Sequence, residues 1–301
     1  MEKVNYRGWP NCYRLASDEV ELIVTSDVGP RIIRFAFKGG PNVFKEYDAM
    51  MGLTGGDAWR IYGGHRFWHA PEIAARTYYP DNSPVAISQE DGFVRVTSPT
   101  ESTTGMQKEL DIRLWPAGAH ARVTHRLCNN GLWAVELAPW ALSVTAAGGK
   151  VIIPLPPRGS HPEALLPTNT ITLWAYTFMA DPRWTWGNKY IMLRQEAAAT
   201  KPQKFGALVT DGWVACANYG NLFVKKFAYQ PGAAYPDLGC SVEAFTDAEM
   251  LEVETLGPLV RLEPGATVEH VEDWYLHRDV PAPADDADVE RDVLPRVQSD
   301  G

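Results

Sequence analysis

The sequence predicts an all-β fold built from antiparallel strands. Short runs of alternating apolar and polar residues occur along the chain, for example over 107–115 and 121–128. Such alternation is typical of half-buried strands. Turn-forming Gly, Pro, Asn and Asp residues separate these runs about every eight to twelve residues, as in sandwiches and barrels. Helical periodicity is nearly absent, so we expect a core made by sheets alone.

The N-terminal third predicts two hairpins and one short strand. Residues 20–25 and 31–37 are rich in β-branched and aromatic side chains and are joined by a turn that contains Gly and Pro. A short strand is predicted over 42–47. Residues 85–88 and 93–98 form the second hairpin around an Asp-Gly turn.

The rest of the chain continues the same pattern. Pro139 lies inside one apolar run, and a proline within a strand indicates a sheet edge or a bulge. The predicted strands cover residues 107–115, 121–128, 133–145, 170–178, 190–195, 205–210, 212–219, 221–227, 250–256 and 265–276.

The predicted organisation is one β-sandwich domain over residues 1–278, followed by an acidic tail over 279–301. The tail contains six Asp and one Glu against two Arg, which gives 2 − 7 = −5 charges. It has few apolar residues with which to pack, so we expect it to be disordered.

Composition limits the classes of function. The net charge of −9 argues against a nucleic-acid partner, because phosphate binding needs clustered Lys and Arg. The eleven Trp and twelve Tyr exceed what a core needs, and a surplus of aromatic residues often lines carbohydrate clefts.

Location and cofactors are predicted from what the sequence lacks. The N-terminus has no apolar segment of a signal peptide, and no run of about 18 apolar residues occurs, so we expect neither a signal peptide nor a membrane span in this sequence. The four cysteines contain no CxxC pair, which argues against a zinc ribbon or a thioredoxin-type site. We expect a cytoplasmic protein with reduced thiols, no cofactor and no metal.

The segment 62–72, Tyr-Gly-Gly-His-Arg-Phe-Trp-His-Ala-Pro-Glu, is the strongest candidate for a functional motif. Two imidazoles, a guanidinium, three aromatic rings and a carboxylate lie within eleven residues. Rings can stack on the apolar faces of a sugar, while Arg, His and Glu can bond its hydroxyls. A surface loop whose His and Arg only satisfy carbonyl groups is the alternative.

Several short motifs, in the right order over about residues 10 to 277, resemble the galactose mutarotase (aldose 1-epimerase) superfamily. The opening hairpin contains Gly-Pro-Arg-Ile, and an Asn-Asn-Gly turn ends at Gly131. The C-terminal third contains Phe-Val-Lys-Lys-Phe from Phe223, Leu-Glu-Val-Glu-Thr-Leu-Gly-Pro from Leu251, and Leu-Glu-Pro-Gly from Leu262. The resemblance implies an antiparallel β-supersandwich with a sugar cleft on its concave face.

The resemblance also implies a catalytic base. Mutarotases open the sugar ring with a glutamate that takes the proton of O1 and a histidine that protonates O5. Glu254 matches the glutamate position, and Glu252 has the same strand parity and is a poorer alternative. A structural carboxylate paired with Lys or Arg is the other interpretation of Glu254.

The family's acid is missing from its expected place. Residues 133–140, which follow the Asn-Asn-Gly turn, contain no histidine, and the family's Asp-His pair is absent near 186–190. His65, His69 or His161 could replace the acid, because imidazole titrates near neutral pH. His65 and His69 also have the i, i+4 spacing of helical zinc ligands, but the flanking glycines and Pro71 disfavour a helix.

The residues expected to bind substrate are aromatic, basic or acidic side chains near these motifs. Acidic residues in the loop around Asp237 could hold a sugar hydroxyl or calcium, or simply be solvated. The expected set is Arg66, Trp68, Glu72, Trp140, His161, Trp186, Lys189, Tyr235, Asp237 and Glu243.

Three functions are consistent with this sequence. The favoured one is an aldose 1-epimerase-like isomerase that acts on a free sugar or sugar derivative by acid–base catalysis, with Glu254 as base and His65 or His69 as acid. The second is a carbohydrate-binding module without catalysis. The third is a hydrolase or lyase on the same fold, since two carboxylates that flank a cleft support hydrolysis.

Overall fold

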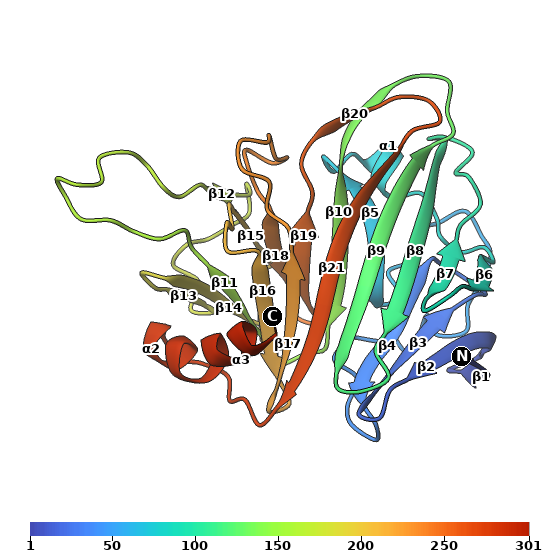
Figure 1. Ribbon diagram of the computed structural model, residues 1–301, viewed down its shortest axis with the longest axis horizontal. Helices are drawn as coiled ribbons and strands as arrows, with labels where there is room; N and C mark the ends of the chain where they lie inside the picture. Colours follow the sequence, from blue (N-terminus) through green and yellow to red (C-terminus); the bar gives the residue numbers. More distant parts are fainter. Residues whose placement is uncertain (301) are drawn as a thin grey trace.

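The computed structural model describes residues 1–300, which form two antiparallel sheets that pack face to face (Figure 1). We call these the first and the second sheet. All pairings between named strands are antiparallel in the described chain, so the predicted all-β architecture is confirmed. Among residues 1–300, no helix has the length and apolar character that crossing a membrane requires.

The first sheet contains eleven strands of the described chain, and it carries the candidate site. In spatial order these are β1 (Glu2–Tyr6), β2 (Trp9–Ala16), β3 (Val20–Thr25), β4 (Arg31–Phe37), β5 (Gly64–Ala70), β10 (Val135–Thr145), β19 (Leu251–Leu256), β18 (Val242–Thr246), β15 (Gln203–Ala207) and β12 (Ile171–Leu173), with β20 (Val260–Leu262) paired to β10. A short helix, α1 (Ala74–Thr77), follows β5.

The second sheet contains ten strands of the described chain. Their spatial order is β13 (Trp184–Trp186), β14 (Tyr190–Arg194), β11 (Lys150–Pro154), β16 (Trp213–Asn218), β17 (Asn221–Phe227), β21 (Thr267–Arg278), β9 (His120–Asn129), β8 (Met106–Leu114), β7 (Val94–Thr97) and β6 (Ala86–Gln89). Alternate residues of these strands face the first sheet, which gives the period of two seen in the sequence.

The core lies between the sheets. Phe35 of β4 packs against Phe223 of β17 and Trp274 of β21, with ring centroids 5.9 and 5.8 Å apart. A second apolar cluster joins β15, β18 and β19 to β11, β14 and β16. Burial of these large side chains is the main force that holds the two sheets together.

Pro139 lies at a break in strand pairing. We expected an edge strand or a bulge, but β10 is in the interior of the first sheet, between β5 and β19. Along one side, β10 pairs with β20 as far as Leu137 and with β19 from Trp140 onward. The proline lies between these two pairings, where its missing N–H costs no ladder hydrogen bond to either strand.

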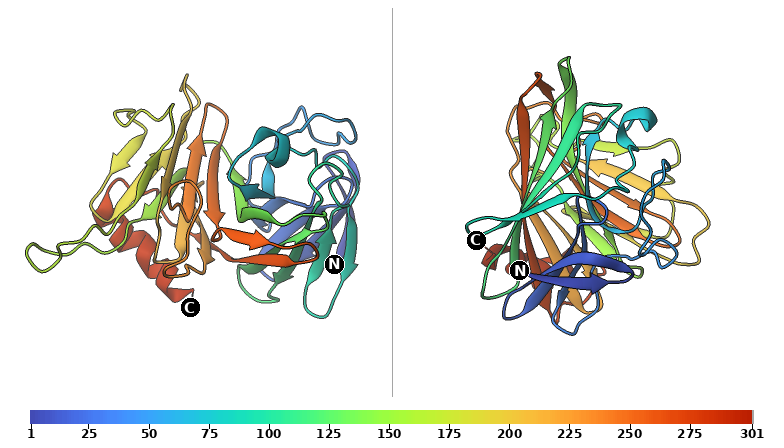
Figure 2. Two further views of the ribbon diagram at one scale, coloured as in Figure 1. Left: turned by 90° about the horizontal axis from the view of Figure 1, so that it is seen from above. Right: turned by 90° about the vertical axis from the view of Figure 1, so that its right-hand side faces the viewer.

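The expectation of a disordered tail is wrong for most of residues 279–300. After β21 the chain forms α2 (Asp286–Asp288), η1 (Val289–Val293) and α3 (Leu294–Ser299), which cover the outer face of the second sheet (Figures 1 and 2). Val289, Val293 and Val297 are buried against that sheet. Their spacing of four residues places them on one helical face, a pattern that the count of acidic residues conceals.

Candidate functional site

A pocket of about 250 Å³ lies on the outer face of the first sheet, the face turned away from the second sheet. Strands β5, β10, β15, β18 and β19, which are neighbours in Figure 1, form its floor, and the segments around Trp59 and Tyr78 form a wall. The lining residues are Trp59, Ile61, Arg66, Trp68, Glu72, Tyr78, Trp140, Leu142, Tyr176, Lys204, Phe245, Met250 and Glu252.

Strand register brings distant parts of the sequence together at this pocket. Arg66 of β5 lies opposite Leu142 of β10, which lies opposite Glu254 of β19, which lies opposite Glu243 of β18. Directly opposed residues of antiparallel strands point to the same face. The Arg66 and Glu254 side chains therefore belong to one row across the sheet, although 188 positions separate them in the sequence.

Two glycines set the course of the chain into β5. Gly63 and Gly64 have φ of +98° and +72°, values that favour glycine. A Cβ on Gly64 would lie 2.5 Å from the Ile32 carbonyl oxygen, so β5 could not approach β4 as it does. The Gly-Gly pair of the motif thus places the following Arg66 in the sheet.

Aromatic rings form one side of the pocket. Trp68 lies 5.4 Å from Trp59, 5.4 Å from Trp140 and 5.0 Å from Tyr78, measured between ring centroids. These near-perpendicular or tilted contacts hold the rings in fixed positions. Such a surface can stack against the apolar face of a sugar ring.

Arg66 is held by a carboxylate and an indole. One Nη donates to Glu252 Oε1 at 2.7 Å, and the guanidinium lies 4.3 Å from the ring centroid of Trp68. Arg66 is 3 % exposed, and its Nε and other Nη have no hydrogen-bond partner among the described residues. These two donors are available to hydroxyl groups of a ligand.

Lys204 of β15 is a pocket residue that the sequence reasoning missed. Its Nζ lies 2.8 Å from Glu243 Oε2 and 3.5 Å from Glu254 Oε2. The ammonium is also 4.7 Å from the ring centroid of Trp140 and 4.8 Å from that of Trp174. The available signal was a lysine directly before the apolar run Phe-Gly-Ala-Leu-Val, since a buried lysine is rare unless it is paired.

Glu254 is fully buried beneath the pocket residues Trp140 and Lys204 and is not itself part of the pocket lining. Its Oε2 accepts a hydrogen bond from Trp140 Nε1 at 2.8 Å, and its Oε1 has no partner within the described chain. Burial raises the pKa of this carboxyl to about 7, although Lys204 lowers it in part. A carboxyl with a pKa near 7 can gain and lose a proton at neutral pH.

Two other glutamates share this environment. Burial raises the pKa of Glu243 well above its ordinary value, even though Lys204 opposes the shift. Glu252 lines the pocket and is neutralised by Arg66, which lies 2.7 Å away. Glu254 has the longer ion pair, 3.5 Å from Lys204, against 2.7 Å between Glu252 and Arg66.

His65 lies on the opposite face of β5 from Arg66, between the two sheets. Its Nδ1 is 2.9 Å from Ser143 Oγ and its Nε2 is 2.7 Å from His125 Nε2. Burial, together with the neighbouring His125, lowers the pKa of His65 well below its ordinary value. Residues 65, 67 and 69 share this inward face because side chains alternate along a strand.

His69 is also turned away from the pocket. It is buried, and burial lowers its pKa to about 3. Its Nε2 has no hydrogen-bond partner among residues 1–300, and its Nδ1 is 3.5 Å from Arg76. The structure thus does not bring either candidate acid into the row that contains Arg66 and Glu254.

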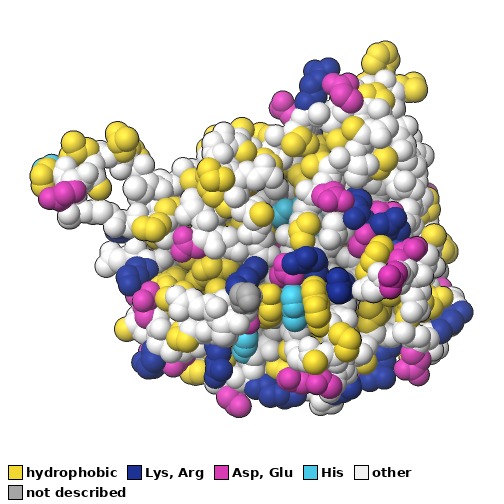
Figure 3. Space-filling view, in the orientation of Figure 1, with side chains coloured by type: hydrophobic (Ala, Val, Ile, Leu, Met, Phe, Trp, Pro, Cys, Tyr) yellow, Lys and Arg dark blue, Asp and Glu magenta, His cyan; other side chains and the backbone are white. Residues whose placement is uncertain are grey.

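The expected binding residues divide into two groups. Arg66, Trp68, Glu72 and Trp140 line the pocket, and Glu243 lies against Lys204. His161 is exposed on the segment 155–170, which projects from the body at the left of Figures 1 and 3, and Trp186 and Lys189 belong to the second sheet or its loops. Tyr235 stacks on Tyr229, with centroids 5.5 Å apart, and Asp237 lies in a turn. These last five residues are absent from the described pocket lining.

A cluster of His65, His125 and Glu272 has potential metal ligands within 4.8 Å of one another. However, hydrogen bonds already use these atoms. The two imidazole Nε2 atoms are 2.7 Å apart, and Lys225 Nζ lies 2.6 Å from Glu272 Oε1. A resident ammonium on the carboxylate is a poor neighbour for a cation, so the geometry favours a hydrogen-bonded network over a metal centre.

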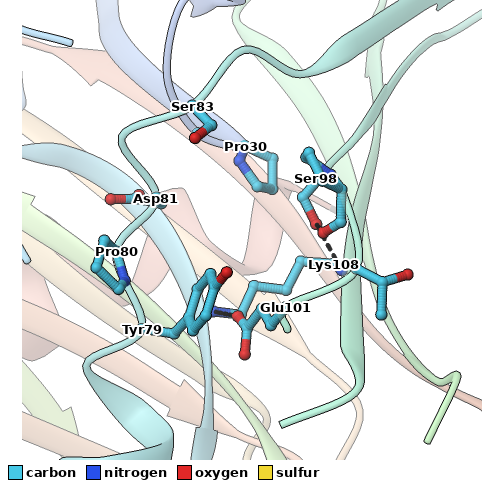
Figure 4. A pocket seen from close by; sticks show the side chains of 11 residues that line it. Pro30, Tyr79, Pro80, Asp81, Ser83, Ser98, Glu101 and Lys108 are labelled. Atoms are coloured by element: carbon cyan, nitrogen blue, oxygen red, sulfur yellow. Dashed lines mark hydrogen bonds and ion pairs between the residues drawn. The ribbon is translucent and has the colours of Figure 1, made fainter. Parts of the chain in front are cut away.

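A smaller cavity lies near Pro30 and Tyr79, where Lys108 forms a buried ion pair with Glu101 at 2.6 Å (Figure 4). Its volume is about 60 Å³. This space suits water molecules rather than a sugar. Of these two cavities, the pocket around Arg66 is the one with room for a sugar.

The chain matches no family model and no curated protein sequence. Its fold, in contrast, is similar to that of many solved structures. A candidate aldose 1-epimerase from Klebsiella pneumoniae superposes with a TM-score of 0.62 at 12 % identity, covering 99 % of this chain and 86 % of that one.

Two further structures agree. A galactose mutarotase-like protein from Clostridium acetobutylicum has a TM-score of 0.55 at 11 % identity, with 92 % and 98 % of the two chains covered. A galactose mutarotase-like protein from Lactobacillus casei has a TM-score of 0.54 at 10 % identity, with 89 % and 100 % covered. The antiparallel β-sandwich of this chain is therefore the galactose mutarotase-like fold that the sequence motifs predicted.

Proposed function

We propose that this protein binds a small sugar in the pocket around Arg66 and interconverts its anomers by acid–base catalysis. The observation that carries the proposal is Glu254, a fully buried carboxyl with a pKa of about 7 and one unpartnered oxygen in the described chain. It accepts a hydrogen bond from Trp140 and lies 3.5 Å from the Lys204 ammonium, and both of these residues line the pocket. The similarity of fold to galactose mutarotase-like proteins supports the substrate class.

In this proposal the roles follow from the contacts. Trp68 and Trp140 pack against the sugar ring, and the free Nε and Nη of Arg66 donate to its hydroxyls. Glu254 removes the proton from O1, and the freed electron pair forms the carbonyl at C1 while the C1–O5 bond breaks and O5 takes up a proton. Rotation about the C1–C2 bond and closure of the ring give the other anomer.

The test is the variant Glu254→Gln. Anomer exchange of D-galactose and D-glucose can be measured by NMR exchange spectroscopy, and binding by calorimetry. A glutamine keeps the shape but cannot accept the proton, so exchange should fall on the order of 100-fold or more while binding persists. The control is Glu263→Gln, which alters an exposed glutamate that is not part of the pocket lining. Undiminished exchange in Glu254→Gln would show that another group is the base.

A binding module without catalysis is the second candidate function. It is favoured by the positions of His65 and His69, which lie away from the pocket. This function requires that the wild-type protein binds a sugar and leaves the rate of anomer exchange at the value found in buffer alone. The same pair of measurements therefore separates the two functions.

A further inference from the structure

We propose that Lys204 is the general acid of this site and donates a proton to the ring oxygen O5 when Glu254 takes the proton from O1. The inference rests on the proposed function, and it assigns a residue type that differs from the histidine of mutarotases. No other residue of the described pocket lining is an ammonium, so Lys204 alone supplies this type of donor there.

The position of Lys204 supports the assignment. It lines the pocket on β15, and its Nζ is 3.5 Å from the Glu254 oxygen that also accepts from Trp140. The acid and the base are thus close enough to act on one end of a small ring. A ligand at this end would have O1 beside the carboxylate and O5 beside the ammonium, since these oxygens share the carbon C1.

The Lys204 ammonium has two neighbouring carboxylates, which leaves one of its three N–H groups for a ligand. Its Nζ donates to Glu254 Oε2 at 3.5 Å and forms an ion pair with Glu243 Oε2 at 2.8 Å. The indoles of Trp140 and Trp174 enclose the group at 4.7 and 4.8 Å. An ammonium has three N–H donors, so the third can reach an incoming oxygen.

Packing of Trp174 against Gly206 helps to hold the Lys204 ammonium in this position. Gly206, two residues along β15 on the same face, lies opposite Glu243. A Cβ on Gly206 would be 3.2 Å from the Trp174 ring, so glycine leaves the space in which this indole packs. Trp174 in turn borders the ammonium, which limits its freedom to leave the pocket.

Each proton and electron pair in the ring-opening step has a source and a destination. The O1–H bond breaks, its proton goes to Glu254, and its electron pair forms the C1=O1 bond. The C1–O5 bond breaks, its electron pair stays on O5, and O5 takes a proton from the Lys204 ammonium. Ring closure on the other face reverses each transfer, so both residues return to their starting states without an oxidant or a reductant.

Lys204 becomes a stronger acid when its neighbour Glu254 is protonated. Burial favours a neutral lysine, but Glu254 and Glu243 outweigh it and raise the pKa of Lys204 well above its ordinary value. When Glu254 accepts the O1 proton, it becomes neutral and no longer stabilises the ammonium. Lys204 then has only Glu243 beside it, a carboxyl whose own pKa is raised by burial, so Lys204 holds its proton less tightly and transfer to O5 becomes easier.

The experiment compares Lys204→Arg and Lys204→Met with the wild type. Arginine keeps the positive charge next to Glu243, but a guanidinium does not release its proton. Methionine keeps the apolar stem between the two indoles and removes the charge. We expect both variants to bind D-galactose or D-glucose and to exchange its anomers more slowly by on the order of 100-fold. Lys201→Met, at an exposed lysine three residues earlier, should exchange at the wild-type rate.

The outcomes separate this inference from the proposed function. Wild-type exchange together with slow exchange and retained binding in Lys204→Arg supports Lys204 as the acid. Wild-type rates in Lys204→Arg overturn proton donation and leave the charge alone as the contribution of Lys204. If Lys204→Met fails to fold because Glu243 and Glu254 lose their cation, Lys204→Arg still decides the question. Absence of exchange in the wild type overturns the proposed function and this inference together.

Discussion

At the scale of single residues, the site depends on how a few buried charges share protons. Glu254 is flanked by Lys204, Glu243 and Glu252, and Arg66 also acts on it at longer range. Burial disfavours the carboxylate, while the two cations and the Trp140 N–H favour it. The balance leaves Glu254 with a pKa of about 7, so small changes in its contacts should be visible as changes in pH dependence.

The rate of anomer exchange should therefore rise with pH through an apparent pKa near 7, since the base must be ionised. Trp140→Phe removes the N–H that stabilises the carboxylate, and it should move the midpoint to higher pH. Trp59→Phe is the matched control, because the Trp59 Nε1 has no partner among residues 1–300. Exchange rates measured by NMR from pH 5 to pH 9 provide the test. A midpoint that does not move in Trp140→Phe would contradict the role of this hydrogen bond.

At the scale of elements, strand β5 and the C-terminal helices show how local pattern and packing combine. Alternation along β5 places Arg66 and Trp68 in the pocket and sends His65 and His69 to the other face. The C-terminal segment has an acidic exposed side, but its three buried valines give it an apolar side that fits the second sheet. The two sides of each element therefore have different surroundings: the pocket and the space between the sheets for β5, and solvent and the second sheet for the C-terminal segment.

The valine face of the C-terminal segment should contribute measurably to stability. Val293→Ala removes two buried methyl groups and leaves a small cavity, which should lower the free energy of unfolding by about 2 kcal/mol. Gln298→Ala changes an exposed residue of the same segment and should have little effect. Urea unfolding followed by circular dichroism measures both. Equal stability of Val293→Ala and the wild type would mean that the segment does not pack on the sheet in solution.

At the scale of the whole molecule, a polar network lies between the two sheets. Lys225 and Glu272 form an ion pair at 2.6 Å, and His125, His270 and His65 complete the network through hydrogen bonds with neighbours such as Ser143 and Thr255. Burial is the main cause that lowers the pKa of His125 to about 4 and of His270 to about 3. The histidines are therefore neutral in the folded protein at pH 6.

This network should make the protein less stable in mild acid. Below pH 6.5 the unfolded chain binds protons on these histidines and the folded chain does not, so stability falls as pH decreases toward 4. For His125 alone the loss at pH 5 is roughly 2 kcal/mol. Glu254 acts in the opposite direction between pH 4.5 and 7, because its pKa is raised on folding.

The test compares how steeply the unfolding free energy changes with pH in each protein. All the proteins contain Glu254, so its contribution cancels in the comparison. His125→Asn should show a shallower fall of unfolding free energy between pH 7 and pH 5 than the wild type. His161→Asn, at an exposed histidine on the projecting segment, should keep the wild-type slope. Equal slopes in all three proteins would show that His125 does not control acid stability.

The sequence by itself determined the fold class and pointed to part of the candidate site. Alternating strands, regular turns and the motifs around Gly131 and Leu262 were sufficient for the galactose mutarotase-like sandwich, because these signals depend only on neighbouring residues. Local reasoning pointed to Arg66 and Trp68 within the segment 62–72, and the resemblance to the galactose mutarotase superfamily pointed to Glu254.

Only the tertiary structure decided which side of each strand faces the pocket and which distant strands meet there. Lys204 escaped notice because its importance comes from Glu243 and Glu254, which lie 39 and 50 positions away and become neighbours through strand pairing. His65 and His69 looked suited to catalysis, but the direction of β5 turns them inward. Register and facing between strands are set by packing of the entire sheet, and no single stretch of sequence contains that information.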